Sequence, residues 1–233
     1  MDKYSITIIS QDLSILVKLI EKYDIPGDYK ALINLEATID FINDNKIEVE
    51  NIEFFIEKKI SGTNPCTIEN IAVFFQNICK FTPENLTHNK DVITEYSFQI
   101  DIDGYDEEAN EYKSCWHLDK NIPSTPPKFT HPYYHFQFGG NTLETCNAGE
   151  LIILGSPRLP HPPMDLFLGF HFIINNFFSS KDYTFVNELL NDDEYQSIIK
   201  RAQERMWTPY FNAFGSTGNL DYTLNNIFPL YIE

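Results

Sequence analysis

The sequence has little positive charge. Its 233 residues include 17 lysines and arginines against 34 aspartates and glutamates, for a formal net charge of −17. Non-specific attraction to a phosphate backbone needs clustered basic residues, so this balance excludes nucleic acid as a partner except through a local patch. The one candidate patch is 200-KRAQER-205, a pattern more typical of the solvated face of a helix. The acidity favours a protein partner with a basic surface.

Paired cysteines and long apolar runs are absent as well. The four cysteines form no C-x-x-C pair, which excludes a zinc knuckle or a thioredoxin-like motif and predicts reduced thiols. The apolar run 163-PMDLFLGFHFIINNFF-178 is shorter than the roughly 20 residues of a membrane span, so it predicts a buried helix and no membrane association. The N-terminus has no apolar signal segment, so we expect a cytoplasmic protein.

The motifs of common enzyme classes are also missing. The chain contains no H-x-E, G-x-S-x-G, H-E-x-x-H, P-loop or G-x-G-x-x-G sequence, which leaves no local signature for a nucleophile, a metal or a dinucleotide. No cofactor is therefore indicated by a motif. A functional site has to come from residues that the fold brings together.

The first third of the chain carries apolar residues at helical spacing. Four stripes recur at intervals of three and four within residues 1–82, which predicts a helical N-terminal part. Ser10 is the expected cap of the first helix. The stripes are Leu13, Leu16, Val17 and Ile20; Leu32, Leu35, Ile39 and Ile42; Ile52, Phe55 and Ile56; and Ile68, Ile71, Phe75 and Ile78.

After residue 91 the period of the apolar residues changes to two. The segments 92-VITEYSFQIDID-103 and 111-EYKSCWHLD-119 alternate and predict a β-hairpin. The segments 131-HPYYHFQF-138 and 149-GELIILGS-156 predict two further strands. Helices follow at 163–178 and 191–206.

We expect an α+β fold with a helical N-terminal third, a central, mostly antiparallel sheet of about four strands, and C-terminal helices packed on one sheet face. A single domain would span residues 1–233, with the sheet and C-terminal helices in 91–233.

Histidines gather on one side of this predicted sheet. If Tyr96, Trp116 and Phe136 point into the core, the alternate residues form a polar face. The loop 156-SPRLPHPPMD-165 adds Arg158 and His161 at its rim. The polar face comprises Glu95, Gln99, His117, Asp119, His131, His135 and Gln137.

Three interpretations of this face stay open. In the first, imidazoles and Asp119 bind a divalent transition metal. Because four residues along a strand separate Cα atoms by about 13 Å, His117 with either His131 or His135 is the favoured ligand pair. In the second, His117 and His135 act as general acid and base beside Asp119, while Arg158 holds a phosphate.

In the third interpretation the face is a solvated or partner-covered surface. Aromatic residues concentrate at the energetically dominant positions of interfaces. The rings of Trp116 and Tyr133 flank the histidines and therefore fit this interpretation. The binding residues would be Trp116, His131, Tyr133, Gln137 and His161.

The order "WHLD", "HPYYHFQFGG" and "SPRLPHPPMDLFLGFHFIINNFF" resembles small uncharacterised bacterial proteins of toxin–antitoxin and phage-defence gene clusters. Those proteins pair an R-x-D or H-x-D strand with an HP-x-x-H strand. The resemblance covers residues 95–178. It implies a soluble bacterial protein of a defence or toxin–antitoxin module. The acidic surface and the aromatic, histidine-rich sheet face predict that it acts there through protein–protein interaction. The alternative is a histidine-dependent, metal-free or metal-assisted, nuclease or phosphodiesterase.

Overall fold

A seven-stranded antiparallel sheet forms the centre of the computed structural model, and its strands lie side by side in chain order. The structure describes residues 5–42, 44–82, 91–121, 131–139, 143–144, 146, 158–212 and 222–227. The strands are β1 (Gly27–Asp28), β2 (Lys46–Ile56), β3 (Asn70–Phe81), β4 (Ile93–Tyr105), β5 (Glu111–Lys120), β6 (Tyr134–Phe138) and β7 (Leu159–Pro160).

The prediction of about four strands and of a helical first third, with one short extended stretch at Ile47–Val49, is wrong. The α+β class holds, but the sheet has seven strands, and β1, β2 and β3 come from the first third. Apolar residues lie on both faces of β3, where Phe74 and Ile78 alternate with buried Val73, Phe75 and Cys79. Their combined spacing imitates a helical stripe, so periodicity alone could not separate helix from strand.

A register shift hides the period of β2 in the same way. Ile47 and Val49 are buried, and after the shift between Val49 and Ile52 the buried positions change parity to Ile52, Phe54 and Ile56. An irregularity of this kind inserts a residue and bends the strand, so no single alternation runs through it. The predicted strand at 149–156 lies entirely outside the described residues.

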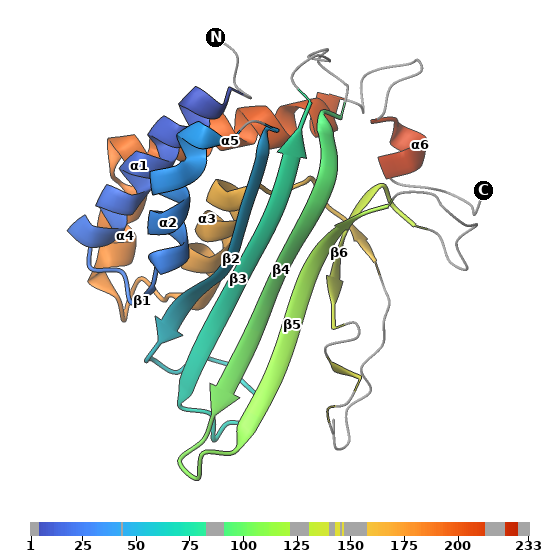
Figure 1. The fold of residues 1–233 in the computed structure, drawn as a ribbon. Coiled ribbons are helices and arrows are strands. Elements are labelled where there is room, and N and C mark those ends of the chain that lie inside the picture. The colour runs from blue at the N-terminus through green and yellow to red at the C-terminus, as the bar shows by residue number, and fades with distance from the viewer. Residues whose placement is uncertain are drawn as a thin grey trace.

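Helices α1 to α5 gather on one side of the sheet (Figure 1). The helical predictions around Leu13, Leu32, Phe170 and Ile198 are confirmed, although α1 begins at Ile6 after Ser5 and not after Ser10. The helices are α1 (Ile6–Lys22), α2 (Lys30–Thr38), the 3₁₀ turn η1 (Ile39–Phe41), α3 (Leu166–Phe177), α4 (Thr184–Leu190), α5 (Asp193–Asn212) and α6 (Leu224–Ile227). Within the described ranges, no helix combines the length and apolarity that crossing a bilayer requires.

The central helix α3 packs closely on the sheet through Gly169. A Cβ at this position would come within 2.2 Å of Phe75 and 2.8 Å of Phe98. Phe170 of the same helix contacts Phe54, with ring centroids 5.4 Å apart. The glycine therefore permits an approach that places large aromatic rings in van der Waals contact.

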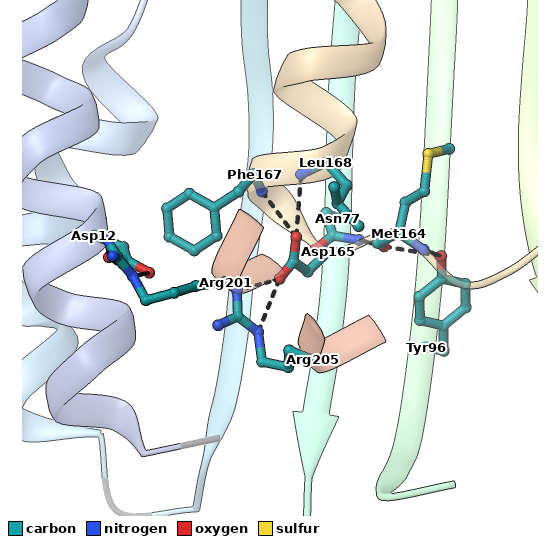
Figure 2. A network of polar contacts seen from close by, with 9 residues as sticks. All are labelled: Asp12, Asn77, Tyr96, Met164, Asp165, Phe167, Leu168, Arg201 and Arg205. Carbon is teal, nitrogen blue, oxygen red and sulfur yellow. Dashed lines mark hydrogen bonds and ion pairs between the residues drawn. The ribbon is translucent and has the colours of Figure 1, made fainter. Parts of the chain in front are cut away.

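A buried ion pair joins α3 to α5 (Figure 2). Asp165 caps α3 by accepting from the backbone N–H groups of Phe167 and Leu168, at 3.2 and 3.1 Å. Its other oxygen accepts from Nε of Arg205 at 3.0 Å, and the Arg205 side chain has no exposed surface. Burial of two charges is tolerated here because each satisfies the other.

The predicted basic patch at 200–205 is therefore not a free solvated face. Arg205 is buried against Asp165, and Arg201 donates from Nε to buried Asp12 of α1 at 2.9 Å. Both arginines fasten α5 to its neighbours. The patch retains Lys200 as its exposed basic residue.

Removal of the Asp165 carboxylate tests this anchor. We expect Asp165→Ala to lower the free energy of unfolding by about 3–5 kcal/mol, because it leaves a buried guanidinium unpaired and removes a helix cap. Urea unfolding followed by circular dichroism measures the change. Lys30→Ala is the control, since it breaks an ion pair with Asp28 whose lysine is 83% exposed, and its unfolding midpoint should stay at the wild-type value. A wild-type midpoint for Asp165→Ala would contradict the expectation.

Candidate functional site

Strand pairing brings the predicted catalytic residues together at the β5–β6 edge of the sheet. His117 lies opposite Gln137, and Asp119 lies opposite His135. His135 in turn lies opposite Pro160 of β7, and Arg158 immediately precedes that strand. The parity of the two strands thus delivers the side chains to one face, as the alternation in the sequence predicted.

Two imidazoles converge on one carboxylate. Nε2 of His117 lies 3.2 Å from Oδ2 of Asp119, and Nε2 of His135 lies 3.9 Å from the same oxygen. Asp119 is half exposed, so it remains within reach of solvent. The carboxylate therefore orients His117 directly and adds negative charge beside His135.

His131 joins the cluster in spite of its distance along the chain. Its Nε2 lies 3.3 Å from Nε2 of His135. The expectation that these rings would be too far apart is wrong, because β6 begins only at Tyr134 and the preceding residues do not continue the extended strand. A bend at Tyr133 replaces the roughly 3.3 Å rise per residue on which that distance depended.

The hydrogen bonds of the histidine pair determine which nitrogens carry protons. Nδ1 of His135 lies 3.3 Å from the carbonyl oxygen of Pro132, which can only accept, so Nδ1 is the protonated nitrogen of neutral His135. Its Nε2 then accepts from Nε2–H of His131. This leaves Nδ1 of His131 as the nitrogen with a lone pair. The part played by the Pro132 carbonyl was missed from the sequence, because backbone atoms leave no residue-type signal.

Burial distinguishes the members of the cluster. His135 and Gln137 are only 2% and 7% exposed, whereas His117 and His131 are partly exposed. At β6 the chain itself covers these polar side chains, and His135 bonds to His131 and to the Pro132 carbonyl. His117, Asp119 and His131 stay at the surface. A bound molecule would reach His117, His131 and Asp119 before it reached His135.

The surroundings move the histidine pKa values in opposite directions. The hydrogen bond with Asp119 raises the pKa of His117, and a further bond with Gln137 acts in the same direction. Burial lowers the pKa of His135 to about 4, with help from the charge of His131. Burial also lowers the pKa of His131. The site therefore holds one imidazole that favours its proton and two that favour the neutral form.

Asp119 stays ionised between these rings. Burial by itself would raise the pKa of this carboxyl, but the hydrogen bond from His117 and the positive charge of the neighbouring imidazoles outweigh that effect and lower it. An ionised carboxylate in turn stabilises the imidazolium form of His117. The two groups support each other's charge.

Arg158 supplies a fixed positive charge at the rim. It lies close enough to His117, His131 and His135 for its charge to lower the pKa of each ring. Its Nε is buried without a hydrogen-bond partner in the described part of the chain. A buried donor left unsatisfied costs free energy, so a bound acceptor at this nitrogen would be favourable.

Other predicted binding residues lie away from the cluster. Trp116 stacks on Phe136 with ring centroids 5.3 Å apart, and His161 packs on the same ring at 5.5 Å. Tyr133 donates to Asp91 at 3.1 Å. These three side chains hold the edge of the core, so the structure does not bring them together with His117 and Asp119.

The described residues offer no cluster of three or more His, Cys, Asp or Glu side chains arranged to hold a metal ion. The metal interpretation consequently has no support from the geometry of His117, His131, His135 and Asp119. The convergent arrangement instead places imidazoles of raised and lowered pKa beside a carboxylate and a guanidinium.

Titration of the histidines tests the electrostatics of the site. We expect the NMR signals of His135 to report a pKa of about 4 and those of His117 a pKa above the ordinary 6.5. The stability tied to neutral His135 is present above pH 6.5 and is lost as the pH falls toward 4. The stability tied to charged His117 is present below pH 6.5 and is lost as the pH rises through its raised pKa.

Asp119→Asn should lower the pKa of His117 while leaving that of His171 on α3 unchanged, because only the former contacts the carboxylate. An unshifted His117 in this variant would show that Asp119 does not hold its proton.

Comparisons of the chain with protein families, with curated proteins and with solved structures found no significant match.

Proposed function

We propose that the cluster of His117, Asp119, His131, His135 and Arg158 is an acid–base site that cleaves a phosphodiester bond in a short or single-stranded RNA. One observation carries the proposal: His117 lies 3.2 Å from Asp119, His131 lies 3.3 Å from His135, and His135 lies 3.9 Å from the same carboxylate. Beside them stands the Arg158 guanidinium, whose buried Nε has no partner among the described residues. Chemistry of this kind uses proton transfer and charge stabilisation and needs no cofactor.

The protonation states assign a role to each side chain. Neutral His131, held by His135, would take the proton from the ribose 2′-hydroxyl, and the 2′-oxygen would attack phosphorus. As the bond between phosphorus and the 5′-oxygen breaks, His117 would donate its proton to that oxygen. The products are a 2′,3′-cyclic phosphate and a free 5′-hydroxyl. Arg158 would hold the phosphate oxygens, and Asp119 would orient His117.

The acidity of the chain limits the substrate. With a net charge of −17, the protein repels a long phosphate backbone except near its local positive groups. The side chain of Asp119, half exposed at the site, adds to that repulsion. A short RNA fits the site better than a duplex or a long polymer.

Cleavage of a fluorogenic RNA dinucleotide in the presence of EDTA tests the proposed function. We expect His117→Ala and His131→Ala each to lower kcat/KM by about 10²–10⁴-fold, the usual contribution of a general acid or base. His171→Ala is the matched control, because His171 bonds to Tyr195 on the helical side and should leave activity near the wild-type value. The corresponding DNA dinucleotide should remain intact because it lacks the 2′-hydroxyl.

Undiminished cleavage by His117→Ala or His131→Ala would refute the assignment. Cleavage of the DNA dinucleotide at a similar rate would refute the 2′-hydroxyl mechanism.

A second candidate function is the binding of a protein partner with a basic surface. A groove of about 410 Å³ lies between α1, α2 and the β1–β2 edge, lined in part by Ile33 and Phe55 and by acidic Glu21 and Asp28. Ile33 is 46% exposed and Phe55 is 40% exposed. Lys30 also lines the groove and pairs with Asp28 at 2.6 Å, so Glu21 is the carboxylate left to attract a basic segment that carries an apolar anchor. The partner would belong to the defence or toxin–antitoxin module that the sequence resemblance implies.

Co-purification from a bacterial host tests this second function. We expect a near-stoichiometric basic partner to be lost from Ile33→Ser/Phe55→Ser and retained by Phe211→Ser, a matched change at a residue 53% exposed on α5. Cross-links from the partner should map to α2 and β2. A partner that binds all the variants equally would place the interface elsewhere.

A further inference from the structure

A cavity separate from the histidine cluster lies where the segment after β2 meets the turn between α3 and α4. It has a volume of about 610 Å³ and is formed where residues 58–61, which follow β2, meet residues 175–190 from α3 and α4. Tyr183 holds the two segments together, because its hydroxyl accepts from the backbone N–H of Lys58 at 2.9 Å. Ligand cavities commonly measure about 300–1,000 Å³, so this one has room for a small molecule.

Positive charge is concentrated in this cavity. Lys58, Lys59 and Lys181 line it, against the single carboxylate of Asp182. Lys59 donates from Nζ to the carbonyl oxygen of Cys66, and its ammonium retains further hydrogens for a ligand. The remaining polar lining consists of serine hydroxyl and asparagine amide groups, which can donate to oxygen anions.

These lysines differ from most others in the protein. Within the described part of the chain, lysines such as Lys22, Lys30, Lys46, Lys80, Lys113 and Lys120 form ion pairs with carboxylates. Lys58, Lys59 and Lys181 form no ion pair with the described residues. All three lysine side chains are exposed to solvent, and the carboxylates of Glu57 and Asp182 both act on Tyr183 at the same cavity. The cavity therefore keeps a small excess of positive charge in a protein with a net charge of −17, which favours an anionic ligand.

The apolar part of the wall narrows the class of ligand. Phe177 is partly exposed at the cavity, next to buried Phe178 and Tyr183. An aromatic ring offers a flat surface to a heterocyclic base, while ammonium groups attract phosphate as point charges. The cavity therefore combines one surface for a ring with several donors for phosphate oxygens.

We propose that this cavity binds a phosphate-bearing small molecule of nucleotide size, with its phosphates on Lys58, Lys59 and Lys181. The cavity shares no residue with the histidine–arginine cluster, so the proposal stands or falls independently of the phosphodiesterase function. Occupancy would join the segment after β2, which carries Lys58 and Lys59, to the turn before α4, which carries Lys181.

Calorimetric titration of the full chain with ATP, adenosine and inorganic triphosphate tests the proposal. We expect ATP to bind with a dissociation constant on the order of micromolar to tens of micromolar, inorganic triphosphate to displace it, and adenosine to bind far more weakly. Affinity should fall as salt is added, since the interaction is ionic. Lys58→Glu/Lys181→Glu should weaken ATP binding by at least about tenfold, because two attractions become repulsions.

Lys18→Glu/Lys200→Glu is the matched control. It makes the same change in net charge at two exposed lysines on α1 and α5, outside the cavity, and should bind ATP as the wild type does. His117→Ala should also bind normally, which separates this site from the histidine cluster. If Lys58→Glu/Lys181→Glu loses its circular dichroism spectrum, Lys58→Gln/Lys181→Gln takes its place.

The proposal is overturned if ATP does not bind the wild type, if the cavity variant binds as tightly as the wild type, or if the control variant loses affinity equally.

Discussion

The buried pair of Asp165 and Arg205 is the interaction on which the placement of the other elements depends. Neither charge is tolerable alone in that position, so the loop before α3 and the middle of α5 must be brought together whenever the core forms. The preceding residue, Met164, is held to β4 by both its N–H and its carbonyl, which contact the Tyr96 hydroxyl at 3.0 and 2.9 Å. One short segment thereby connects the sheet to the helices (Figure 2).

The same connection also helps to place Arg158 beside the histidines of the candidate site. Arg158 lies a few residues before the anchored segment, and β7 pairs with β6 between them. The guanidinium is therefore brought to the histidines at the start of β7, while His117 and Asp119 are presented by β5. The histidines, Asp119 and Arg158 come from different segments of the chain, and each depends on the same ladder of strand pairing for its position.

Much of the candidate site followed from the sequence, but less of the fold did. Alternation along β4 and β5 correctly predicted a hairpin with His117 and Asp119 on one face, because a strand places every second side chain on the same side. Alternation failed in β2 and β3, where a register shift and apolar residues on both faces imitate a helical period. The contact of His131 with His135 depended on a bend that no residue pattern records.

No local sequence pattern could have predicted the cavity lined by Lys58, Lys59 and Lys181. Lys58 and Lys181 are far apart in the chain, and neither lies in a basic run. Only the packing of α4 beside the end of β2 brings them to one place. Tertiary contact of this kind is the general limit of inference from periodicity, since a pattern reports on the faces of an element and not on which element lies opposite.

The two outer strands have a consequence for behaviour in a crowded cell. β1 and β7 each contain only two residues, and β7 ends in Pro160, which has no backbone N–H to donate. Long, flat outer strands act as templates on which further chains add by backbone pairing. Beside β7 the sheet ends in the five-residue strand β6, so little backbone is open there, but β1 pairs with only two residues of the eleven-residue strand β2. Strand-by-strand polymerisation is therefore opposed by strand length at the β7 border and by repulsion between strongly acidic molecules at the β2 border.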